Sequence, residues 1–483
     1  MFMTKATKIV ATISDKRCDV DFIRELYIEG MNVVRMNSAH LNREGFLKII
    51  NNVRAVSNHI AILMDTKGPE VRTTIAENDN IEITAGDIIK VKGDPDQMSR
   101  KGEIYVNYPH FVRDLNVGDD ILIDDGEIDL KVESKVDGFL HCKAMNDGSL
   151  GSRKSVNVPG VRINLPSLTA RDKENILFAI EQDIDFIAHS FVRNKQDLMD
   201  IQQILDEHKS PIKIISKIEN QEGVDNIDEI MEHTYGVMIA RGDLGIEVAQ
   251  EKIPGIQRKL IRKCVQARKP VIVATQMLHS MIKNPRPTRA EVTDIANAIY
   301  YRTDALMLSG ETAYGKYPVE AVRTMATIAK EAEKTKMAEN DIPIKISTHD
   351  LTSFLSNAAV ETSTKLGTKA IITDTYSGRT ARFLAAYRGT VPVLAICYHD
   401  RSTRELALSY GVVPIYQEGK GNTQQYFIEA LQHLLEWGWI ESDSLVCYLS
   451  GSFGEGFGTT FLEVNNVDKI LESRDKYLLP NFE

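Results

Sequence analysis

The sequence predicts an α/β protein: a (β/α)8 barrel with an inserted small β-domain lid, followed by a C-terminal domain with an open α/β sheet. Two observations predict the barrel. Eight short apolar runs recur along the chain with amphipathic segments between them, and they are continuous in Val, Ile and Leu, as in parallel strands buried on both faces. A third observation predicts the insertion, because one interval between runs is much longer than the others. Eight βα units favour a closed barrel.

The strand-like runs are expected at 7–13, 32–37, 61–65, 185–191, 213–219, 236–243, 270–277 and 304–311. Between them, segments such as TARDKENILFAIEQ and KIPGIQRKLIRKCVQAR have apolar residues at helical spacing. They are typical of the crossover helices of βα units.

The long interval, from about 70 to 165, is rich in Gly, Asp and short alternating runs such as NIEITAGDIIKVKGD. Turn residues recur every few positions, which predicts a small antiparallel β-domain. Because it follows the third barrel strand, this domain is expected on the C-terminal rim, where it would act as a lid over an active site.

A polar segment at 333–350 predicts a linker after the helix that begins near Pro318. From Leu351 onward helical and strand patterns alternate again, with strand-like runs AIITDT, VPVLAICY, VVPIYQ, SLVCYLSG and TTFLEVNN. This pattern predicts a separate α/β domain with an open, mostly parallel sheet.

The composition excludes several classes of protein. A chain of 483 residues is expected to form roughly two to four domains. A net charge of -10 argues against a broad nucleic-acid-binding surface. The five cysteines are scattered without metal-ligand spacing, which favours a reducing compartment. The apolar runs are too short to span a membrane and the N-terminus lacks a signal-peptide pattern, so we expect a soluble cytoplasmic protein with no membrane partner.

Polar residues gather where the barrel strands are expected to end, which is where the active sites of such barrels lie. They are Arg35, Asn37, Asp65, Thr66, Lys67, Ser190, Lys217, Glu219, Arg241, Asp243, Thr275, Ser309 and Glu311. Lys217 and Glu219 are two residues apart on one strand and therefore point to the same face.

A lysine beside two carboxylates suits phosphoryl or enolate chemistry. Glu219 and Asp243 offer hard oxygen ligands, which select Mg2+ or Mn2+ over zinc. The alternative is a pair of structural ion pairs, Lys217 with Glu219 and Arg241 with Asp243, that close the barrel mouth. That alternative does not explain why the other polar residues gather at the same rim.

Two glycine-rich motifs are weaker indications. GETAYGKY at 310–317 nearly matches a P-loop, but Tyr317 stands where the Mg2+-binding Ser or Thr is required. GSFGEGFGTTF at 451–461 follows a strand without an acidic residue at dinucleotide-fingerprint distance, which favours a flexible loop that contacts a ligand.

Eight motifs in order resemble those of the pyruvate kinase family along nearly the whole chain. They are ATKIVATI, GMNVVRMN, DTKGPEVRT, GSRKSVNVPG, IISKIENQEGV, IARGDLGIE, ATQMLHSMIKNPRPTRAEVTDIANAI and LSGETAYGKYP. The resemblance implies a catalytic barrel at 1–68 and 161–343, an inserted β-barrel lid domain at 69–160 and a C-terminal α/β domain at 344–483. It also implies glycolytic transfer of a phosphoryl group from phosphoenolpyruvate to ADP, giving pyruvate and ATP, with Mg2+ and K+. A homotetramer is implied as well.

The resemblance assigns a role to each matching residue. It implies that Lys217 stabilises the transferred phosphoryl group, that Glu219 and Asp243 hold Mg2+, and that Thr275 lies where the enolate is protonated. The backbone at Gly242 and Asp243 would bind the substrate carboxylate. Further roles fall on Arg35 at the phosphoryl group, on Asn37, His40, Arg72 and Lys154 at the nucleotide, and on Asn37, Asp65 and Thr66 as K+ ligands.

The chain departs from the family pattern at the K+ site. The family typically reads R-x-N-F-S-H-G, whereas this chain reads RMNSAHL, so the family's serine hydroxyl falls on Ala39. Ser38 is one residue away and is expected on the opposite face of the strand. Glu70 nevertheless resembles the form that accompanies K+ dependence. We expect K+ to activate weakly or at higher concentration. His279 and Arg302 also replace the family's usual glutamate and glycine.

TYSGRTARF at 375–383 resembles the family's sugar-phosphate effector loop. Thr375, Ser377, Gly378, Arg379 and Thr380 suit a phosphorylated metabolite at a helix N-terminus. The alternative is a helix start with Ser377 as the N-cap. The second half of the effector site, at 451–461, lacks the tryptophan and arginine of the fructose-bisphosphate-binding members.

Two other functions remain open from the sequence. One is a Mg2+-dependent lyase or aldolase that handles the pyruvate enolate, which would need no nucleotide. The other is a non-catalytic paralogue that binds metabolites, which would be expected to have lost the lysine or the metal-binding acids. Because Lys217, Glu219, Asp243 and Thr275 are all present, we favour the kinase.

Overall fold

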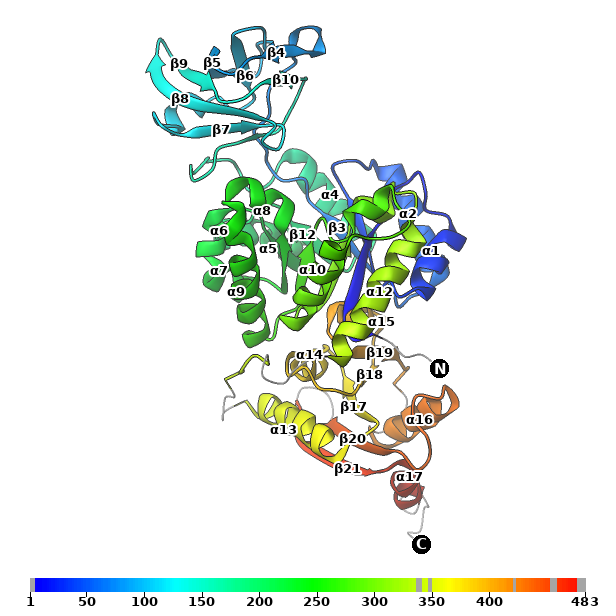
Figure 1. Cartoon of the computed structure of the whole chain (residues 1–483). Helices are drawn as coiled ribbons and strands as arrows, with labels where there is room; N and C mark the ends of the chain where they lie inside the picture. Colours follow the sequence, from blue (N-terminus) through cyan, green and yellow to red (C-terminus); the bar gives the residue numbers. More distant parts are fainter. Residues whose placement is uncertain (1–4, 336–340, 346–349, 420–422, 452–457, 476–483) are drawn as a thin grey trace.

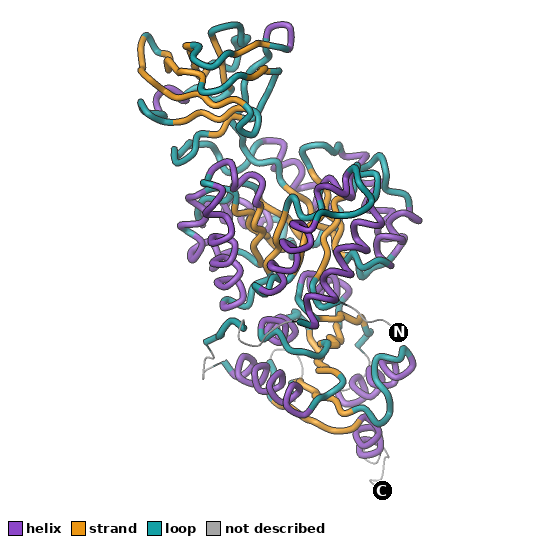
Figure 2. Tube along the Cα trace, in the orientation of Figure 1, coloured by secondary structure: helices purple, strands orange, loops and turns teal. Residues whose placement is uncertain are grey.

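The computed structural model describes residues 5–335, 341–345, 350–419, 423–451 and 458–475. Three bodies follow one another along the long axis of the molecule (Figure 1). The inserted β-domain lies at one end, the helix-wrapped barrel in the middle and the C-terminal domain at the other end (Figure 2).

The central body is a closed barrel of eight parallel strands, as predicted. Its strands are β1 (Lys8–Thr12), β2 (Val33–Asn37), β3 (Ala61–Asp65), β12 (Phe186–His189), β13 (Lys213–Ile218), β14 (Gly236–Ala240), β15 (Val271–Ala274) and β16 (Ala305–Leu308). Each strand pairs with the barrel strands that precede and follow it along the chain, so β3 pairs with β12 across the insertion. β1 pairs with β16 to close the ring.

Several strands are shorter than expected. The run at 236–243 was expected to be all strand, but β14 ends at Ala240 and a helix begins at Arg241. The run at 304–311 likewise ends as a strand at Leu308, because SGE starts a helical turn. The polar ends of these runs lie at the rim, where the chain leaves the sheet. Glu311 is buried there and accepts hydrogen bonds from Leu278 N and Ser309 N.

Helices surround the barrel. They are α1 (Val20–Ile28), α2 (Arg43–Val56), α4 (Ala170–Glu181), α5 (Lys195–Glu207), α6 (Gln221–Asp225), α7 (Ile227–His233), α8 (Arg241–Glu247), α9 (Ile253–Gln266), α10 (Arg289–Tyr300), α11 (Gly310–Ala313) and α12 (Pro318–Lys334), with 3-10 turns η2 (Gln250–Lys252) and η3 (His279–Ile282). Thr169 and Thr288 start α4 and α10 with capping boxes.

Two apolar layers hold the barrel. The outer layer joins the strands to the helices, and the inner layer fills the ring with side chains such as Leu63, Phe186 and Met238. Ala407 and Leu408, from the 3-10 turn η5 (Leu406–Leu408) of the C-terminal domain, belong to the inner layer. The C-terminal domain therefore closes the amino-end floor of the barrel.

The inserted domain contains a six-stranded sheet of order β11-β7-β8-β9-β5-β6 and a two-stranded sheet of β10 and β4. Its elements are η1 (Glu77–Asp79), β4 (Ile81–Ile83), β5 (Ile88–Gly93), β6 (Glu103–Val106), α3 (Phe111–Asp114), β7 (Asp120–Ile123), β8 (Ile128–Val136), β9 (Phe139–Ala144), β10 (Gly148–Leu150) and β11 (Val156–Asn157). The pairing is antiparallel except between β5 and β6. The described strands thus pair as two sheets, where the family resemblance implied a β-barrel.

The C-terminal domain has a five-stranded sheet of order β19-β18-β17-β20-β21, in which only β21 is antiparallel to its neighbour. Its elements are α13 (Leu351–Leu366), β17 (Ala370–Thr375), α14 (Arg379–Ala386), β18 (Val393–Cys397), α15 (Asp400–Glu405), β19 (Val412–Tyr416), α16 (Thr423–Glu436), β20 (Leu445–Ser450), β21 (Phe461–Asn466) and α17 (Val467–Asp475). Apolar clusters cover both faces of the sheet, as predicted for an open α/β domain.

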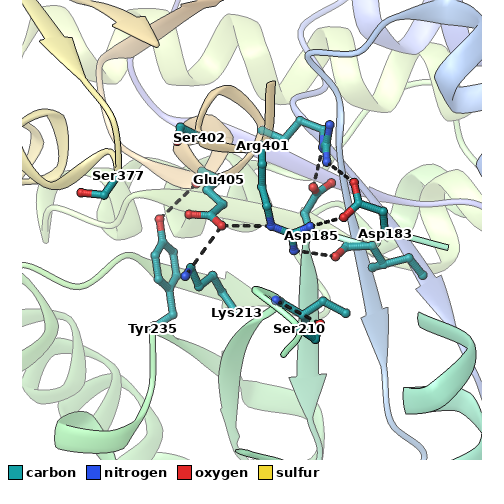
Figure 3. Close-up of polar contacts among 12 residues, drawn as sticks. Asp183, Asp185, Ser210, Lys213, Tyr235, Ser377, Arg401, Ser402 and Glu405 are labelled. Atoms are coloured by element: carbon teal, nitrogen blue, oxygen red, sulfur yellow. Dashed lines mark hydrogen bonds and ion pairs between the residues drawn. The ribbon is translucent and has the colours of Figure 1, made fainter. Parts of the chain in front are cut away.

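A network of charged side chains joins the barrel floor to α15 (Figure 3). The Asp185 carboxylate is fully buried and accepts hydrogen bonds from Ile62 N at 2.8 Å and from the guanidinium groups of Arg54 and Arg404. Arg401 and Arg404 also pair with Asp183. Because Asp185 directly precedes β12, these bonds fix the C-terminal domain against the strand.

None of the described helices is long and apolar enough to cross a membrane.

Candidate active site

Lys217 lies at the centre of the carboxyl end of the barrel. Its Nζ is 2.9 Å from Oε1 of Glu219 and donates a hydrogen bond of 2.7 Å to Oγ of Ser190. Asp65 Oδ2 lies 3.5 Å from the same ammonium. The side chain of Lys217 is only 11% exposed. The predicted convergence of Lys217 and Glu219 on one face is therefore present in the structure.

Asp65 connects Lys217 to Arg35. Arg35 donates to Asp65 Oδ2 from Nε, at 3.0 Å, and from Nη2. Its Nη1 donates to Oγ1 of Thr12, 3.0 Å away. One carboxylate at the end of β3 therefore holds the cations of two other strands. Arg35 comes from the adjacent β2, and Lys217 comes from β13, which lies beyond β12 on the other side of β3.

Glu219 is held on its other oxygen by the backbone. Phe191 N donates to Oε2 of Glu219 at 2.7 Å, and Phe191 has a positive φ of 56°. This left-handed conformation is uncommon for a bulky residue and aims the amide at the carboxylate. Neither Thr12 nor Phe191 was singled out from the sequence, since their roles depend on contacts between distant strands.

The charges at this rim are unequal. Asp65, Glu219 and Asp243 face Arg35 and Lys217, which leaves three carboxylates against two cations. Burial opposes the charged form of Lys217, but Glu219 and Asp65 raise its pKa above the ordinary value. Burial raises the pKa of Glu219, Lys217 opposes this shift, and Asp243 adds to it. An added cation would relieve the repulsion between Glu219 and Asp243.

The donor set fits a divalent metal of the Mg2+ type. Glu219 and Asp243 are oxygen ligands, and Mg2+ is commonly held by one or two carboxylates with substrate oxygens completing its shell. The described residues contain no group of three His, Cys, Asp or Glu side chains that would hold a metal by themselves. Two carboxylates fill only part of the shell of Mg2+, so the site suits a metal that also takes oxygens from a substrate.

The predicted K+ ligands are partly engaged. Asn37 Oδ1 accepts from Ala39 N at 3.0 Å, and Thr66 O accepts from Ser190 Oγ at 2.7 Å. Asp65 Oδ1 is buried and has no hydrogen-bond partner among the described residues. The hydroxyl of Ser38 is also buried without such a partner.

Ser38 was expected on the opposite face of a strand, but β2 ends at Asn37 and Ser38 begins a turn. Strand alternation therefore does not determine the direction of its hydroxyl. Oδ1 of Asp65, unpartnered within the described part of the chain, suits a monovalent cation at this rim.

Thr275 follows β15 in a strained backbone. Thr275 and Gln276 have φ values of 72° and 55°. Oγ1 of Thr275 accepts from Gly242 N at 2.8 Å, and a Cβ added at Gly242 would lie 3.3 Å from that oxygen. The glycine thus permits the close approach that places the Thr275 hydroxyl beside α8.

Arg241 supports the same turn. Its Nη2 donates to Thr275 O at 2.8 Å, and its Nη1 pairs with Asp294 Oδ2 at 2.7 Å. The alternative reading paired Arg241 with Asp243, but the structure pairs it with Asp294. Asp243 therefore keeps its carboxylate for the cleft that it lines.

A cleft of about 840 Å3 lies between the inserted domain and the barrel. Asp243 and Glu247 line it from α8, and Arg72 and Lys154 line it from the inserted domain. The structure thus brings together the two predicted nucleotide cations and one predicted metal ligand. Arg72 Nε pairs with Glu70 at 2.6 Å and Lys154 Nζ pairs with Asp124 at 2.6 Å, so each cation is held by an acid.

Two residues predicted at the nucleotide lie elsewhere. Asn37 and His40 are not among the residues that line this cleft, and His40 is exposed. Glu247 was missed from the sequence. Its Oε1 accepts from Nδ2 of Asn157 at 3.0 Å, and this bond ties the inserted domain to the barrel.

The predicted effector residues lie at the start of α14. Gly378, with a φ of 72°, is the N-cap, and Ser377 is exposed without capping the helix, so the alternative of a Ser377 N-cap is wrong. Gly378 N donates to Oγ1 of Thr375 at 3.0 Å. Arg379 pairs with Asp350 at 3.0 Å, and the hydroxyls of Thr380 and Thr459 are 2.9 Å apart. Most of the glycine-rich motif at 451–461, namely 452–457, lies outside the described residues.

A family model described as the barrel domain of pyruvate kinase matches residues 4–322. A second, for the alpha/beta domain of pyruvate kinase, matches residues 354–464. The chain belongs to the pyruvate kinase family. The predicted resemblance is confirmed, as are the barrel and the C-terminal α/β domain.

Similar proteins support the same conclusion over nearly the whole length. A pyruvate kinase of Borreliella burgdorferi is 45% identical over 478 residues, which cover 98% of this chain and 100% of the relative. One from Bacillus licheniformis is 42% identical, with 97% of this chain and 81% of the relative covered. The crystal structure of a pyruvate kinase from Cryptosporidium parvum superposes with a TM-score of 0.90 at 34% identity, covering 95% of this chain and 96% of the other.

Replacing Asp65 with Asn should destabilise the protein. Asp65→Asn leaves Arg35 and Lys217 buried with one counter-charge fewer, and breaking a buried ion pair costs about 3 to 5 kcal/mol. Arg35 and Lys217 also outweigh burial and hold the pKa of Asp65 below its ordinary value. Its stabilisation is therefore complete above about pH 4 and is lost as the pH falls further.

The measurement is the urea midpoint at neutral pH, with Asp96→Asn as the matched control because Asp96 is exposed on the inserted domain. An unchanged midpoint in Asp65→Asn would show that the ion-pair network contributes no stability.

Proposed function

We propose that this chain transfers the phosphoryl group of phosphoenolpyruvate to ADP, giving pyruvate and ATP. The observation that carries the proposal is the buried Lys217, which is held by Glu219, Asp65 and Ser190 at the mouth of the barrel, beside the cleft that Asp243 shares with Arg72 and Lys154. The family membership supports the same reaction, because the relatives are named pyruvate kinases.

Phosphoryl transfer requires charge stabilisation and positioning more than covalent help from the protein. We assign Lys217 and Arg35 to the oxygens of the transferred group, because both are cations fixed by Asp65. The bond from phosphorus to the enolate oxygen breaks as a bond to an oxygen of the ADP β-phosphate forms. Since Lys217 stays charged, it acts by electrostatics and not as a base.

The enolate that leaves must gain a proton on carbon to become pyruvate. We assign Thr275 to this proton transfer, because the Gly242 amide donates to its hydroxyl and holds it at the start of α8, next to the proposed metal ligand Asp243. We assign the backbone of Gly242 and Asp243 to the substrate carboxylate. In this structure the Gly242 amide already donates to Thr275, so substrate binding would require that bond to be shared or exchanged.

Mg2+, or Mn2+, is the proposed divalent cofactor, held by Glu219 and Asp243, and it would supply positive charge to the substrate's carboxylate and phosphate. K+ is the proposed monovalent cofactor, with Asn37, Asp65 and Thr66 as ligands. Arg72 and Lys154 are assigned to the ADP phosphates from the inserted domain. Asn37 and His40 stay assigned to the nucleotide, although neither lines the cleft in this structure. Closure of this domain would exclude water and suppress hydrolysis.

We further propose a cytoplasmic homotetramer with a phosphorylated metabolite as effector at Thr375, Ser377, Gly378, Arg379 and Thr380. The exposed Arg379 at the start of α14 supports the effector assignment. The lyase or aldolase and the non-catalytic paralogue are not favoured by any relative described above.

Lys217→Met should lower kcat for ATP formation about a hundred- to a thousandfold, as expected when one preorganised charge is removed from a transition state. Methionine fills a similar volume, so the barrel should still fold, but the buried carboxylates of Asp65 and Glu219 lose a partner and the variant should be less stable. Lys213→Met is the matched control, because Lys213 begins the same strand at the floor of the barrel, 3.8 Å from Glu405. Near-normal transfer by Lys217→Met would refute the role given to this lysine.

K+ should activate this enzyme more weakly than it activates Ala39→Ser, a variant that restores the serine hydroxyl typical of the family. We expect turnover in K+ to exceed turnover in Na+, and Ala39→Ser to lower the K+ concentration needed for half activation. The reason is that Asn37, Asp65 and Thr66 remain while the serine hydroxyl is absent. The measurement is the initial rate against K+ concentration at constant ionic strength. Equal turnover in Na+ and K+ would contradict the proposed site.

Arg379→Ala should abolish the response to sugar phosphates, because it removes the guanidinium assigned to the effector phosphate. The measurement is the rate at subsaturating phosphoenolpyruvate with and without a series of sugar phosphates. Lys365→Ala is the control, since Lys365 is an exposed lysine of α13 paired with Glu361. A response to sugar phosphates that survives in Arg379→Ala would defeat the assignment.

A further inference from the structure

A second cavity, of about 540 Å3, lies at the junction of the barrel and the C-terminal domain. Its walls come from the start of β1, the end of α12, the segment before β18 and the loop after α16. These elements meet where the barrel floor faces the C-terminal sheet (Figure 1). The cavity is therefore at the opposite end of the barrel from Lys217, and its volume is that of a small-molecule site.

The lining of this cavity is strongly cationic. Five lysines line it, Lys5, Lys8, Lys330, Lys334 and Lys369, together with one carboxylate, Glu333. Glu333 is already engaged, because its two oxygens accept from Ala6 N at 2.9 Å and Thr7 N at 2.8 Å. The lining thus carries an excess of positive charge.

Two of these lysines are buried, and their ammonium groups donate to neutral acceptors. Lys5 is 7% exposed and its Nζ donates to Asn32 Oδ1 at 2.9 Å. Lys8 is 5% exposed and its Nζ donates to Val412 O at 2.6 Å. Neither forms a salt bridge among the described residues. Glu333 and, for Lys8, Asp304 attract these groups from beyond salt-bridge distance, and this attraction does not outweigh the effect of burial. Buried charges are usually paired, and an anion would supply the missing partner.

The electrostatics of the two lysines agree with this geometry. Burial, together with the charge of Lys8, lowers the pKa of Lys5 to about 7. Burial also lowers the pKa of Lys8 to about 8. A bound anion would restore the charged form of both groups.

Aromatic residues also line the cavity. Trp437 and Trp439, the only two tryptophans of the chain, line it with Tyr410 and Pro392. Trp437 is 52% exposed, and its ring stacks on His433 with the ring centroids 5.5 Å apart. A cavity lined by both aromatic rings and lysines suits a ligand that combines a planar ring with an anionic group.

We propose that this cavity binds a small molecule of the nucleoside phosphate class, with its phosphate at Lys5 and Lys8 and its base against Trp437 and Trp439. This site is separate from the catalytic cleft and from the effector residues at the start of α14. Lysine provides mobile point charges suited to phosphate, and a tryptophan face accepts any base by stacking.

Tryptophan fluorescence gives a direct test, because both tryptophans lie at the cavity. The holoenzyme is titrated with adenosine 5′-monophosphate, and separately with adenosine and with inorganic phosphate. We expect a saturable change in emission with the nucleotide, weaker binding of adenosine, and competition by inorganic phosphate. No change in emission up to millimolar nucleotide, or equal affinity for adenosine and the nucleotide, would overturn the proposal.

Two variants locate the phosphate. Lys5→Met should weaken the nucleotide about tenfold or more, as expected for loss of one charged hydrogen bond. Lys369→Glu reverses an exposed charge of the lining and tests the same point if Lys5→Met does not fold. Lys365→Glu, outside the cavity, is the matched control and should bind normally. Unchanged affinity in Lys369→Glu and in a folded Lys5→Met would show that the lysines do not hold the ligand.

Discussion

The active-site end of this barrel depends on one buried carboxylate. Asp65 Oδ2 is shared by Arg35 and Lys217, which arrive from β2 and β13. Two like charges cannot remain this close in a buried rim without an acid between them. With Glu219 and Asp243 included, the rim has more carboxylates than cations, so it attracts an added metal cation. The bound cation would in turn attract an anionic substrate.

This arrangement requires a barrel that is closed and rigid at its floor. Residues 407 and 408 fill the inner layer from below, and Asp185 ties β12 to α15 through buried arginines. Arg302 belongs to the same junction. It has a φ of 76°, which explains why glycine is the family's usual residue there, and its guanidinium pairs with Asp341 at 2.7 Å beyond the end of α12. The arginine thus adds an ion pair at the cost of a strained backbone.

Much of the fold could be predicted from local patterns. Buried parallel strands are continuous in branched apolar residues, so the eight barrel strands were found, and the two-residue period placed Lys217 and Glu219 together. The ends of the strands were harder to predict. The chain changes from β14 to α8 at Arg241 because the sheet ends at the barrel rim, and the residue types at 236–243 do not show where that happens. The N-cap of α14 was also missed. A polar side chain usually caps a helix, but here Gly378, in the left-handed conformation, holds the N-cap position that Ser377 was considered for.

The rest of the site depends on contacts between distant segments, which no local pattern reports. The bond from Thr12 to Arg35, the left-handed amide of Phe191 and the link from Glu247 to Asn157 arise only when the ring closes and the inserted domain folds over it. The second cavity is similar, because its lysines and tryptophans come from both ends of the chain.

The most direct measurement is the initial rate of pyruvate formation from phosphoenolpyruvate with Mg2+, with ADP present and with ADP omitted. The account predicts pyruvate only when ADP is present, with one ATP formed for each pyruvate. Pyruvate formed at the same rate without ADP, or no pyruvate in either case, would contradict it.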